Sequence, residues 1–457
     1  MKLSIYPVLV VLIIFSSASI ASAQMYGGGE ANPDLHTNQE ALKAFQDKRF
    51  GMFIHWGPVT LRGEEISWSR GVQIPKEDYD NLYKEFNPVL FNAQDWVKAA
   101  KDAGMKYIVL TARHHDGFCL WDSEYTDYDM ASTPYGKGVV KELAEACKKQ
   151  GIEFGVYYTI CDWWHEDYPV VYPDPNYKFH LERDITDPVV KAKMDLYIQY
   201  MKNQLKELID NYDPTLIWFD GEWEWAWTHE MGMDMYAYLR GLKDDLLINN
   251  RVDKGREGMA GTTKSHIFAG DYATPEQQVG DFDNKNAWET CMTIGKQWAW
   301  KPNDKLKSKR ACIQALINTV GGDGNLLFNV GPMPDGRIEQ RQIDRLKEMG
   351  DWLKINGESI YGTRGGPFKP SKHVVSTRKE NKIYLHLLDY SKTNLKLLFP
   401  SKVKIRRAYF LNGNTSLAVV RDKDNIDINL PQKLPDDIAT VIVLELNKSA
   451  FAVDIIE

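Results

Sequence analysis

The chain has 457 residues, of which 43% are hydrophobic and 26% charged, an ordinary balance for a folded globular protein. This composition excludes disordered, collagenous and small disulfide-scaffold proteins, and a net charge of -7 argues against a nucleic-acid-binding surface. The length suits one large domain followed by a smaller one. All fourteen Trp residues lie between Trp56 and Trp352, so residues 353–457 contain none.

Residues 1–23 have the features of a secretory signal peptide. Lys2 provides the positive start, Ile5–Phe15 is apolar, and Ala21-Ser22-Ala23 has the small residues of a cleavage site. The apolar stretch is shorter than the roughly 20 residues that span a bilayer. We therefore expect an exported protein, periplasmic or secreted, without a membrane span.

Short β-rich segments alternate with amphipathic helical segments between residues 50 and 330. This alternation predicts βαβ units around a parallel sheet, and eight strands fit a (β/α)8-like TIM barrel with insertions. The expected helices include 92–103, 141–150, 189–209 and 233–243, and the expected strands are 50–56, 106–111, 153–158, 215–219, 246–249, 266–270, 288–293 and 325–330.

The pattern changes after Tyr361, where helical periodicity disappears. Segments 382–388, 403–411, 426–430 and 439–444 are short strand-like runs separated by polar turns. They predict a C-terminal antiparallel β-sandwich. We expect three parts in the chain: the signal peptide over 1–23, a catalytic barrel over 24–364, and the β-sandwich over 365–457.

Chemically active side chains stand at the predicted ends of the barrel strands. In TIM barrels the reacting residues come from the C-terminal ends of the strands and the loops that follow them. Seven such positions in succession are hard to explain as packing. In chain order they hold His55, His114 and His115, Tyr157, Trp218 and Asp220, Arg251, Glu276, and Glu289.

These side chains are carboxylates, histidines and indoles, a set that suits a carbohydrate. Sugar C–H faces stack on indole rings, while sugar hydroxyls form hydrogen bonds to charged groups. Two carboxylates can break a glycosidic bond, one as the nucleophile and one as the acid and then the base. The glycine run 321–324 lacks the Lys-Ser/Thr of a phosphate-binding loop.

Five motifs make the chain resemble, from about Phe50 to Tyr361, the α-L-fucosidases of glycoside hydrolase family 29. The resemblance implies an exo-acting retaining glycosidase that removes terminal α-L-fucosyl residues from fucosylated oligosaccharides or polysaccharides, without a cofactor. The motifs are RFGMFIHWG at 49–57, RHHDGFCLW at 113–121, FGVYY at 154–158, WFDG at 218–221 and NLLFNVGP at 325–332.

The resemblance also implies roles for single residues. Asp220 in WFDG matches the family nucleophile, and Glu276 matches the acid/base position. Glu289 is the alternative acid/base, because family members commonly carry Trp-Glu at that point. We favour Glu276, since a loop beyond a strand end can reach over the sugar. The implied sugar-binding residues are His55, Trp68, His114, His115, Tyr157, Trp218, Arg251 and Trp298.

The sequence departs from the family pattern at two places that bear on substrate preference. Ser67 precedes Trp68 where some relatives have Glu, and Trp298-Ala299-Trp300 replaces an aromatic-Gly-Tyr. An α-L-galactosidase of the same family is the first alternative function, because L-galactose adds only a hydroxyl at C6. Trp298 favours an apolar contact and hence fucose.

Two further alternatives are less favoured. A non-catalytic carbohydrate-binding protein would be expected to have lost one carboxylate, whereas both are present. A metal site at His55, His114, His115 and Asp116 would require unusual geometry for the adjacent His114 and His115, so we expect none. The alternating Trp223, Trp225 and Trp227 could form a platform for the leaving group or simply pack the loop.

Overall fold

The computed structural model describes residues 26–170, 172–173, 185–400 and 402–456. The expected signal peptide, with its cleavage site, lies outside these residues. Within these ranges, no helix combines the length and the apolar character that crossing a bilayer requires.

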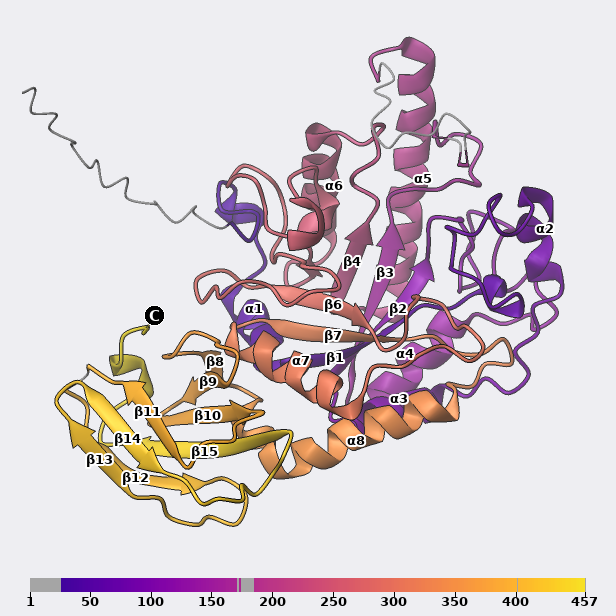
Figure 1. The fold of residues 1–457 in the computed structure, drawn as a ribbon. Coiled ribbons are helices and arrows are strands. Elements are labelled where there is room, and N and C mark those ends of the chain that lie inside the picture. The colour runs from indigo at the N-terminus through magenta and orange to yellow at the C-terminus, as the bar shows by residue number, and fades with distance from the viewer. Residues whose placement is uncertain (1–25, 171, 174–184, 401, 457) are drawn as a thin grey trace, which may run out of the picture.

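Seven parallel strands form the central sheet, in the order β5-β4-β3-β2-β1-β7-β6. Figure 1 shows the sheet curling through the middle of the larger part of the molecule, with helices outside it. This arrangement confirms the predicted barrel-like class. The strands are β1 (Phe50–Ile54), β2 (Tyr107–Arg113), β3 (Glu153–Thr159), β4 (Leu216–Asp220), β5 (Leu247–Ile248), β6 (Glu289–Thr293) and β7 (Asn325–Val330).

The expected strand at 266–270 is wrong, and the segment 271–277 occupies the place between β5 and β6 instead. Isolated parallel bridges join Tyr272 to Asn249 on one side, and Ala273 to Trp288 and Glu276 to Cys291 on the other. Beside β5 the carboxylate of Asp271 accepts the hydrogen bond from the Ile248 N–H (2.7 Å), where a strand would offer a carbonyl. Backbone hydrogen bonds from Asp271 to Ile248 (2.7 Å) and from Asn250 to Tyr272 (2.9 Å) keep the segment paired.

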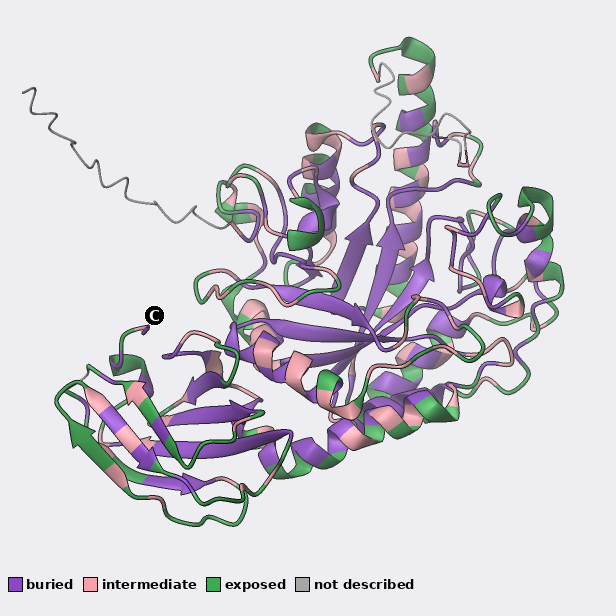
Figure 2. Ribbon diagram, viewed as in Figure 1, coloured by how far each residue is buried: buried purple, intermediate pink, exposed green. Residues whose placement is uncertain are grey.

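The described residues form eight α-helices, and four of them overlap the predicted helices. Their ends follow ordinary capping rules: the Asp187 carboxylate accepts from the backbone N–H groups of Val189 and Val190 at the start of α5, and Gly151 ends α4 at φ 68°. Figure 2 shows buried strands and helices exposed on their outer faces. The helices are α1 (Gln39–Lys48), α2 (Lys76–Asn81), α3 (Ala93–Asp102), α4 (Val139–Gln150), α5 (Pro188–Tyr212), α6 (His229–Leu242), α7 (Lys309–Gly321) and α8 (Gln340–Asn356).

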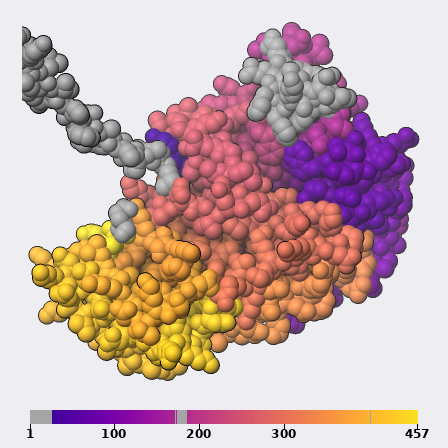
Figure 3. Space-filling model, in the orientation of Figure 1, coloured from indigo at the N-terminus to yellow at the C-terminus, as the bar shows by residue number. Residues whose placement is uncertain are grey.

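The C-terminal part is an antiparallel β-sandwich, as predicted. One sheet has the order β12-β15-β10-β9-β8 and the other β11-β14-β13, and they form a separate lobe in Figure 3. The strands are β8 (Arg364–Gly365), β9 (Val374–Lys379), β10 (Lys382–Leu388), β11 (Asn394–Leu398), β12 (Ile405–Phe410), β13 (Val419–Asp422), β14 (Asn425–Asn429) and β15 (Ala439–Leu446).

The larger sheet of the sandwich is buried on both faces. Ile383 and Leu444, which face each other in β10 and β15, pack in the interior of the sandwich. Tyr384 and Val443, one position along, belong to the hydrophobic core of the barrel. Because alternate strand residues point to opposite faces, this one sheet joins the two cores.

Candidate active site

Asp220, the last residue of β4, is held by three side chains from neighbouring strand ends. Its Oδ1 accepts a hydrogen bond from Nη1 of Arg251 (2.7 Å), and its Oδ2 accepts one from the Tyr157 hydroxyl (3.0 Å). The Nε2 of His115 lies 3.6 Å from Oδ2. Burial alone would raise the pKa of Asp220, but the charge of Arg251 and its hydrogen bond to the carboxylate outweigh burial and lower the pKa. Asp220 is therefore ionised, the state that a nucleophile needs.

Arg251 links Asp220 to the second carboxylate, Glu276. Arg251 lies in a short 3₁₀ turn, Asn250–Val252, just after β5, and is 1% exposed. Its Nη2 donates to Oε2 of Glu276 (2.8 Å), while its Nε donates to Oγ1 of Thr274 (3.0 Å). One rigid guanidinium fork thus brings the two carboxylates to one place.

Glu289, the alternative acid, lies elsewhere. It is the first residue of β6 and is fully buried, where it accepts hydrogen bonds from the Tyr107 hydroxyl and from Nε1 of Trp218 (3.0 Å). Burial raises the pKa of Glu289 to about 7. The carboxylate that reaches Arg251 is that of Glu276, whose side chain keeps 18% of its surface exposed.

Three neutral histidines line the same region. The Nδ1 of His115 lies 2.6 Å from Oγ1 of Thr159. Burial lowers the pKa of His115 to about 4 and that of His55 to about 3, and it holds the pKa of His114 well below its usual value. At neutral pH these rings form hydrogen bonds without carrying charge, which suits sugar hydroxyls.

Aromatic rings complete the pocket. Trp298 lies against His55, with ring centroids 4.8 Å apart. Trp218 stacks on Tyr157 at 5.7 Å and carries the Arg251 guanidinium over its face at 4.4 Å. The structure therefore brings Trp218, Tyr157 and Arg251 into a single cluster around Asp220.

Trp68 and the alternating tryptophans differ in their surroundings. Trp68 lies edge-on to His115 at 5.8 Å and stacks against Trp223 at 6.5 Å. Trp227 is buried, with Nε1 donating to the carbonyl of Val252. Among the three alternating residues, Trp223 contacts the rings of Trp68 and His115, and Trp227 packs the loop.

Sequence reasoning missed two residues that hold the pocket in place. Asn329 on β7 contacts Nδ1 of His55 through Oδ1 (2.7 Å) and donates from Nδ2 to the carbonyl of Trp298 (2.8 Å). Glu65 accepts from the backbone N–H of Trp298 (3.0 Å). An amide inside the apolar run of β7 was a signal for Asn329, whereas the sequence around Glu65 offers none.

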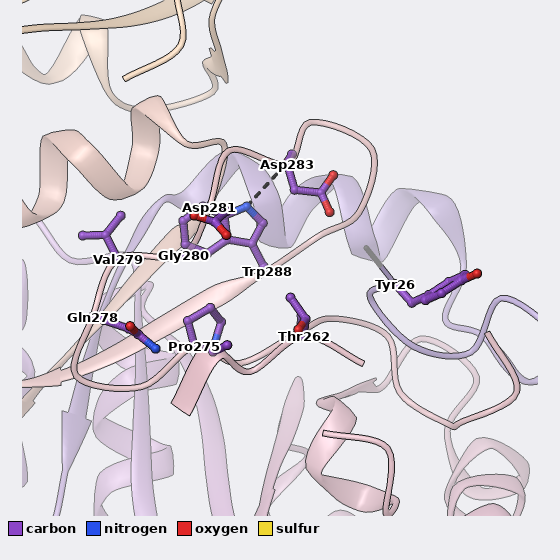
Figure 4. Close-up of a pocket in the computed structure, with 11 residues that line it drawn as sticks. Tyr26, Thr262, Pro275, Gln278, Val279, Gly280, Asp281, Asp283 and Trp288 are labelled. Carbon is purple, nitrogen blue, oxygen red and sulfur yellow. Dashed lines mark hydrogen bonds between the residues drawn. The ribbon is translucent and has the colours of Figure 1, made fainter. Parts of the chain in front are cut away.

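A separate surface pocket of about 180 Å³ lies behind the segment that carries Glu276. Figure 4 shows Pro275, Gln278 and Trp288 on its walls, with the Trp288 indole donating to the carbonyl of Asp283. None of the predicted site residues lines this pocket. Across the residues with described positions, no group of three or more His, Cys, Asp or Glu side chains could hold a metal ion.

Comparisons with known proteins match the chain to a single family. The family model for α-L-fucosidase matches residues 15–358. The plasma α-L-fucosidase of Homo sapiens is 30% identical over 373 residues, covering 76% of each chain. An α-L-fucosidase of Branchiostoma floridae is 30% identical over 385 residues, 77% of this chain and 80% of that one.

Solved structures give the same result. Isoenzyme 1 of α-L-fucosidase from Paenibacillus thiaminolyticus superposes with a TM-score of 0.77 at 34% identity, covering 90% of this chain and 99% of that one. A family 29 α-L-fucosidase from Bacteroides thetaiotaomicron, trapped as a covalent intermediate with 2-fluoro-fucosyl fluoride, gives a TM-score of 0.80 at 26% identity. It covers 90% of this chain and 97% of that chain.

Proposed function

Because the chain belongs to the α-L-fucosidases of glycoside hydrolase family 29, we propose that Asp220 and Glu276 are its catalytic pair. The enzyme is a retaining glycoside hydrolase that releases terminal α-L-fucosyl residues by double displacement. The observation that carries the assignment is the Arg251 guanidinium, which binds both carboxylates at 2.7 and 2.8 Å.

In the first step Asp220 attacks the anomeric carbon. The bond from that carbon to the leaving oxygen breaks, and Glu276 gives its proton to that oxygen. Arg251 and Tyr157 hold the Asp220 carboxylate in the ionised, attacking state. The product of this step is a fucosyl ester on Asp220.

In the second step Glu276 takes a proton from water, and the water oxygen attacks the anomeric carbon. The ester bond to Asp220 breaks, fucose leaves with its original configuration, and the Asp220 carboxylate returns. Partial exposure of Glu276 suits both steps, because leaving group and water must both reach it.

His55, His114 and His115 bind the sugar hydroxyls in this proposal, with Trp68 and Trp298 as apolar walls. The apolar indole of Trp298 favours a methyl group over a hydroxymethyl group at C6. Parallel rates on nitrophenyl α-L-fucoside and α-L-galactoside test this preference, and a faster galactoside reaction would contradict it.

The boundaries of the domains and the export of the protein are also part of the proposal. Residues 1–23 direct export to the periplasm or the medium and are removed, 24–364 form the catalytic barrel, and 365–457 form the sandwich. N-terminal sequencing of exported protein tests this, since retention of Met1 would contradict it.

The first test of the mechanism is Asp220→Asn. The variant should fold normally and lose at least about 10³-fold in kcat, and azide should restore turnover of Asp220→Gly by replacing the missing carboxylate. Asp129→Asn is the matched control, because Asp129 is also buried but binds the backbone N–H groups of Ser123 and Ser132. Near-normal turnover of Asp220→Asn would overturn the assignment.

A further inference from the structure

Ser67, where the sequence departs from the family pattern, lies at the centre of a buried hydrogen-bond network. Its backbone N–H donates to the Tyr79 hydroxyl (2.8 Å), which donates in turn to Oδ2 of Asp116 (2.6 Å). The backbone N–H of Asp116 returns to Oγ of Ser67 (2.9 Å). Ser67 also has φ 59°, a left-handed conformation that costs energy for a residue with a side chain.

The network leaves the Ser67 hydroxyl one partner to which it can donate. A hydroxyl has a single hydrogen, and the Asp116 N–H is necessarily a donor to Oγ. The remaining contact of Oγ is with Nδ1 of His114, at 2.6 Å. If the hydroxyl did not donate to Nδ1, a fully buried donor would lack a partner, at a cost of about 1–3 kcal/mol.

We propose that Ser67 is a positioning residue that fixes His114 with its proton on Nε2, so that His114 donates a hydrogen bond to the bound sugar. This inference rests on the sugar-binding role proposed above for His114. The ring is held in place by stacking on Tyr157, with centroids 5.2 Å apart and planes 7° from parallel. Neutral imidazole carries one proton, so an accepting Nδ1 requires a protonated Nε2.

His55 is held in the other tautomer, with its proton on Nδ1. Asn329 donates from Nδ2 to the Trp298 carbonyl, so its Oδ1 faces His55 and can only accept. The proton of His55 therefore lies on Nδ1, and its Nε2 is an acceptor. The rings of His55 and His114 are 5.5 Å apart, so the pocket presents one acceptor and one donor to neighbouring hydroxyls.

The donor nitrogen of His114 and the acceptor nitrogen of His55 predict how the affinity changes when single hydroxyls of the sugar are replaced. Fluorine can accept a hydrogen bond but cannot donate one. Where the hydroxyl faces His114, the analogue with fluorine in its place should bind more tightly than the analogue with hydrogen. Where the hydroxyl faces His55, both analogues should bind more weakly than fucose. A single hydrogen bond corresponds to roughly a tenfold change in Kd.

The experiment combines a direct and a functional readout. Long-range ¹H–¹⁵N spectra of His-labelled full-length protein at pH 7 should show His114 with its proton on Nε2 and His55 with its proton on Nδ1. Calorimetry with L-fucose and its monodeoxy and monodeoxyfluoro analogues should find one position where fluorine outbinds hydrogen by about tenfold. Ser67→Ala should shift the His114 signals toward protonated Nδ1 and remove that preference.

Ser69→Ala is the matched control, because Ser69 is also buried in the same loop but donates to the Glu65 carbonyl. It should leave both readouts unchanged. The proposal is overturned if His114 carries its proton on Nδ1 in the wild type, or if Ser67→Ala keeps the wild-type tautomer and binding ratios. Failure to bind any fucose analogue would instead contradict the proposed function. The two outcomes are distinguishable because the tautomers are measured on the protein without a bound sugar.

Discussion

Arg251 holds both carboxylates of the site, so its position decides how they face the sugar. Its three nitrogens contact Asp220, Glu276 and Thr274, and a planar fork allows little freedom in how the three are arranged. A lysine could neutralise the charge at this point but could not bind two carboxylates with fixed geometry.

The two acidic candidates should respond differently to the leaving group. Glu276→Gln should lower kcat/KM on a fucosylated disaccharide by about 10²–10³-fold, and much less on an activated nitrophenyl fucoside, whose leaving group needs no proton. Glu289→Gln should affect both substrates equally, because Glu289 acts through Trp218. Measuring both ratios decides between them, and a leaving-group effect confined to Glu289→Gln would reverse the assignment.

Glu289 should also make stability depend on pH. Its pKa is raised from 4.5 to about 7 in the folded state, so the folded state keeps a proton that the unfolded state has lost. The wild type should therefore lose stability relative to Glu289→Gln as the pH rises from about 4.5 to about 7, by roughly 3 kcal/mol. Denaturant unfolding of both proteins across this range measures the difference, and a constant gap would contradict it.

Among the elements, the segment 271–277 shows where sequence reasoning fails. A run of alternate residues points inward, since Tyr272 packs in the barrel interior while Thr274 and Glu276 reach Arg251. The sequence there includes Asp271 and Pro275, which weaken any strand prediction, whereas the apolar run at 266–270 imitates a strand.

Regular elements and the residues at their ends were predictable, and contacts formed between distant loops were not. The strand ending in WFDG places Asp220, and the HH pair after β2 places His114 and His115, because periodicity fixes where those strands stop. Glu65 binds the Trp298 backbone across 233 positions of sequence, a pairing that only tertiary packing creates.

The segment 271–277 should influence catalysis through Thr274. Its hydroxyl donates to Oδ1 of Asn250 (2.8 Å) and accepts from Nε of Arg251. Thr274→Val keeps the shape but leaves that N–H without a partner, so kcat/KM should fall about tenfold or more. Thr290→Val on β6 is the control, because Thr290 is equally buried but donates to the Gln278 carbonyl. An equal effect of both changes would contradict the prediction.

In the whole molecule, the sandwich completes the core of the barrel. Val375 on β9 is fully buried and belongs to the barrel core, and it packs so closely on α7 that a side chain at Gly321 would overlap it. Arg310 of α7 forms an ion pair with Asp389 and donates to the carbonyl of Asp437. We therefore expect the two parts to unfold together.

A charge at this junction tests that expectation. Val375→Asp should lower the Tm of the barrel as well as that of the sandwich, or prevent folding, because an unpaired buried carboxylate costs several kcal/mol. Val420→Asp, at a position 57% exposed on the outer sheet, should leave Tm nearly unchanged. Calorimetry should show one transition for the wild type and for Val420→Asp, and two independent transitions would refute the coupling.

Isolated bridges close the barrel where an eighth strand would stand. This closure separates two properties of the enzyme, the attack of the nucleophile and the choice of leaving group. Asp220 stands on a strand paired along its length, whereas Glu276 stands on a stretch that pairs with its neighbours through isolated bridges, at Tyr272 on the β5 side and at Ala273 and Glu276 on the β6 side. The side chains of that stretch can be exchanged while its backbone bridges to both neighbours remain. Homologues can therefore share the same nucleophilic attack on the sugar and still differ in the leaving groups that they accept. A chimaera that receives this stretch from a homologue should show the leaving-group preference of that homologue.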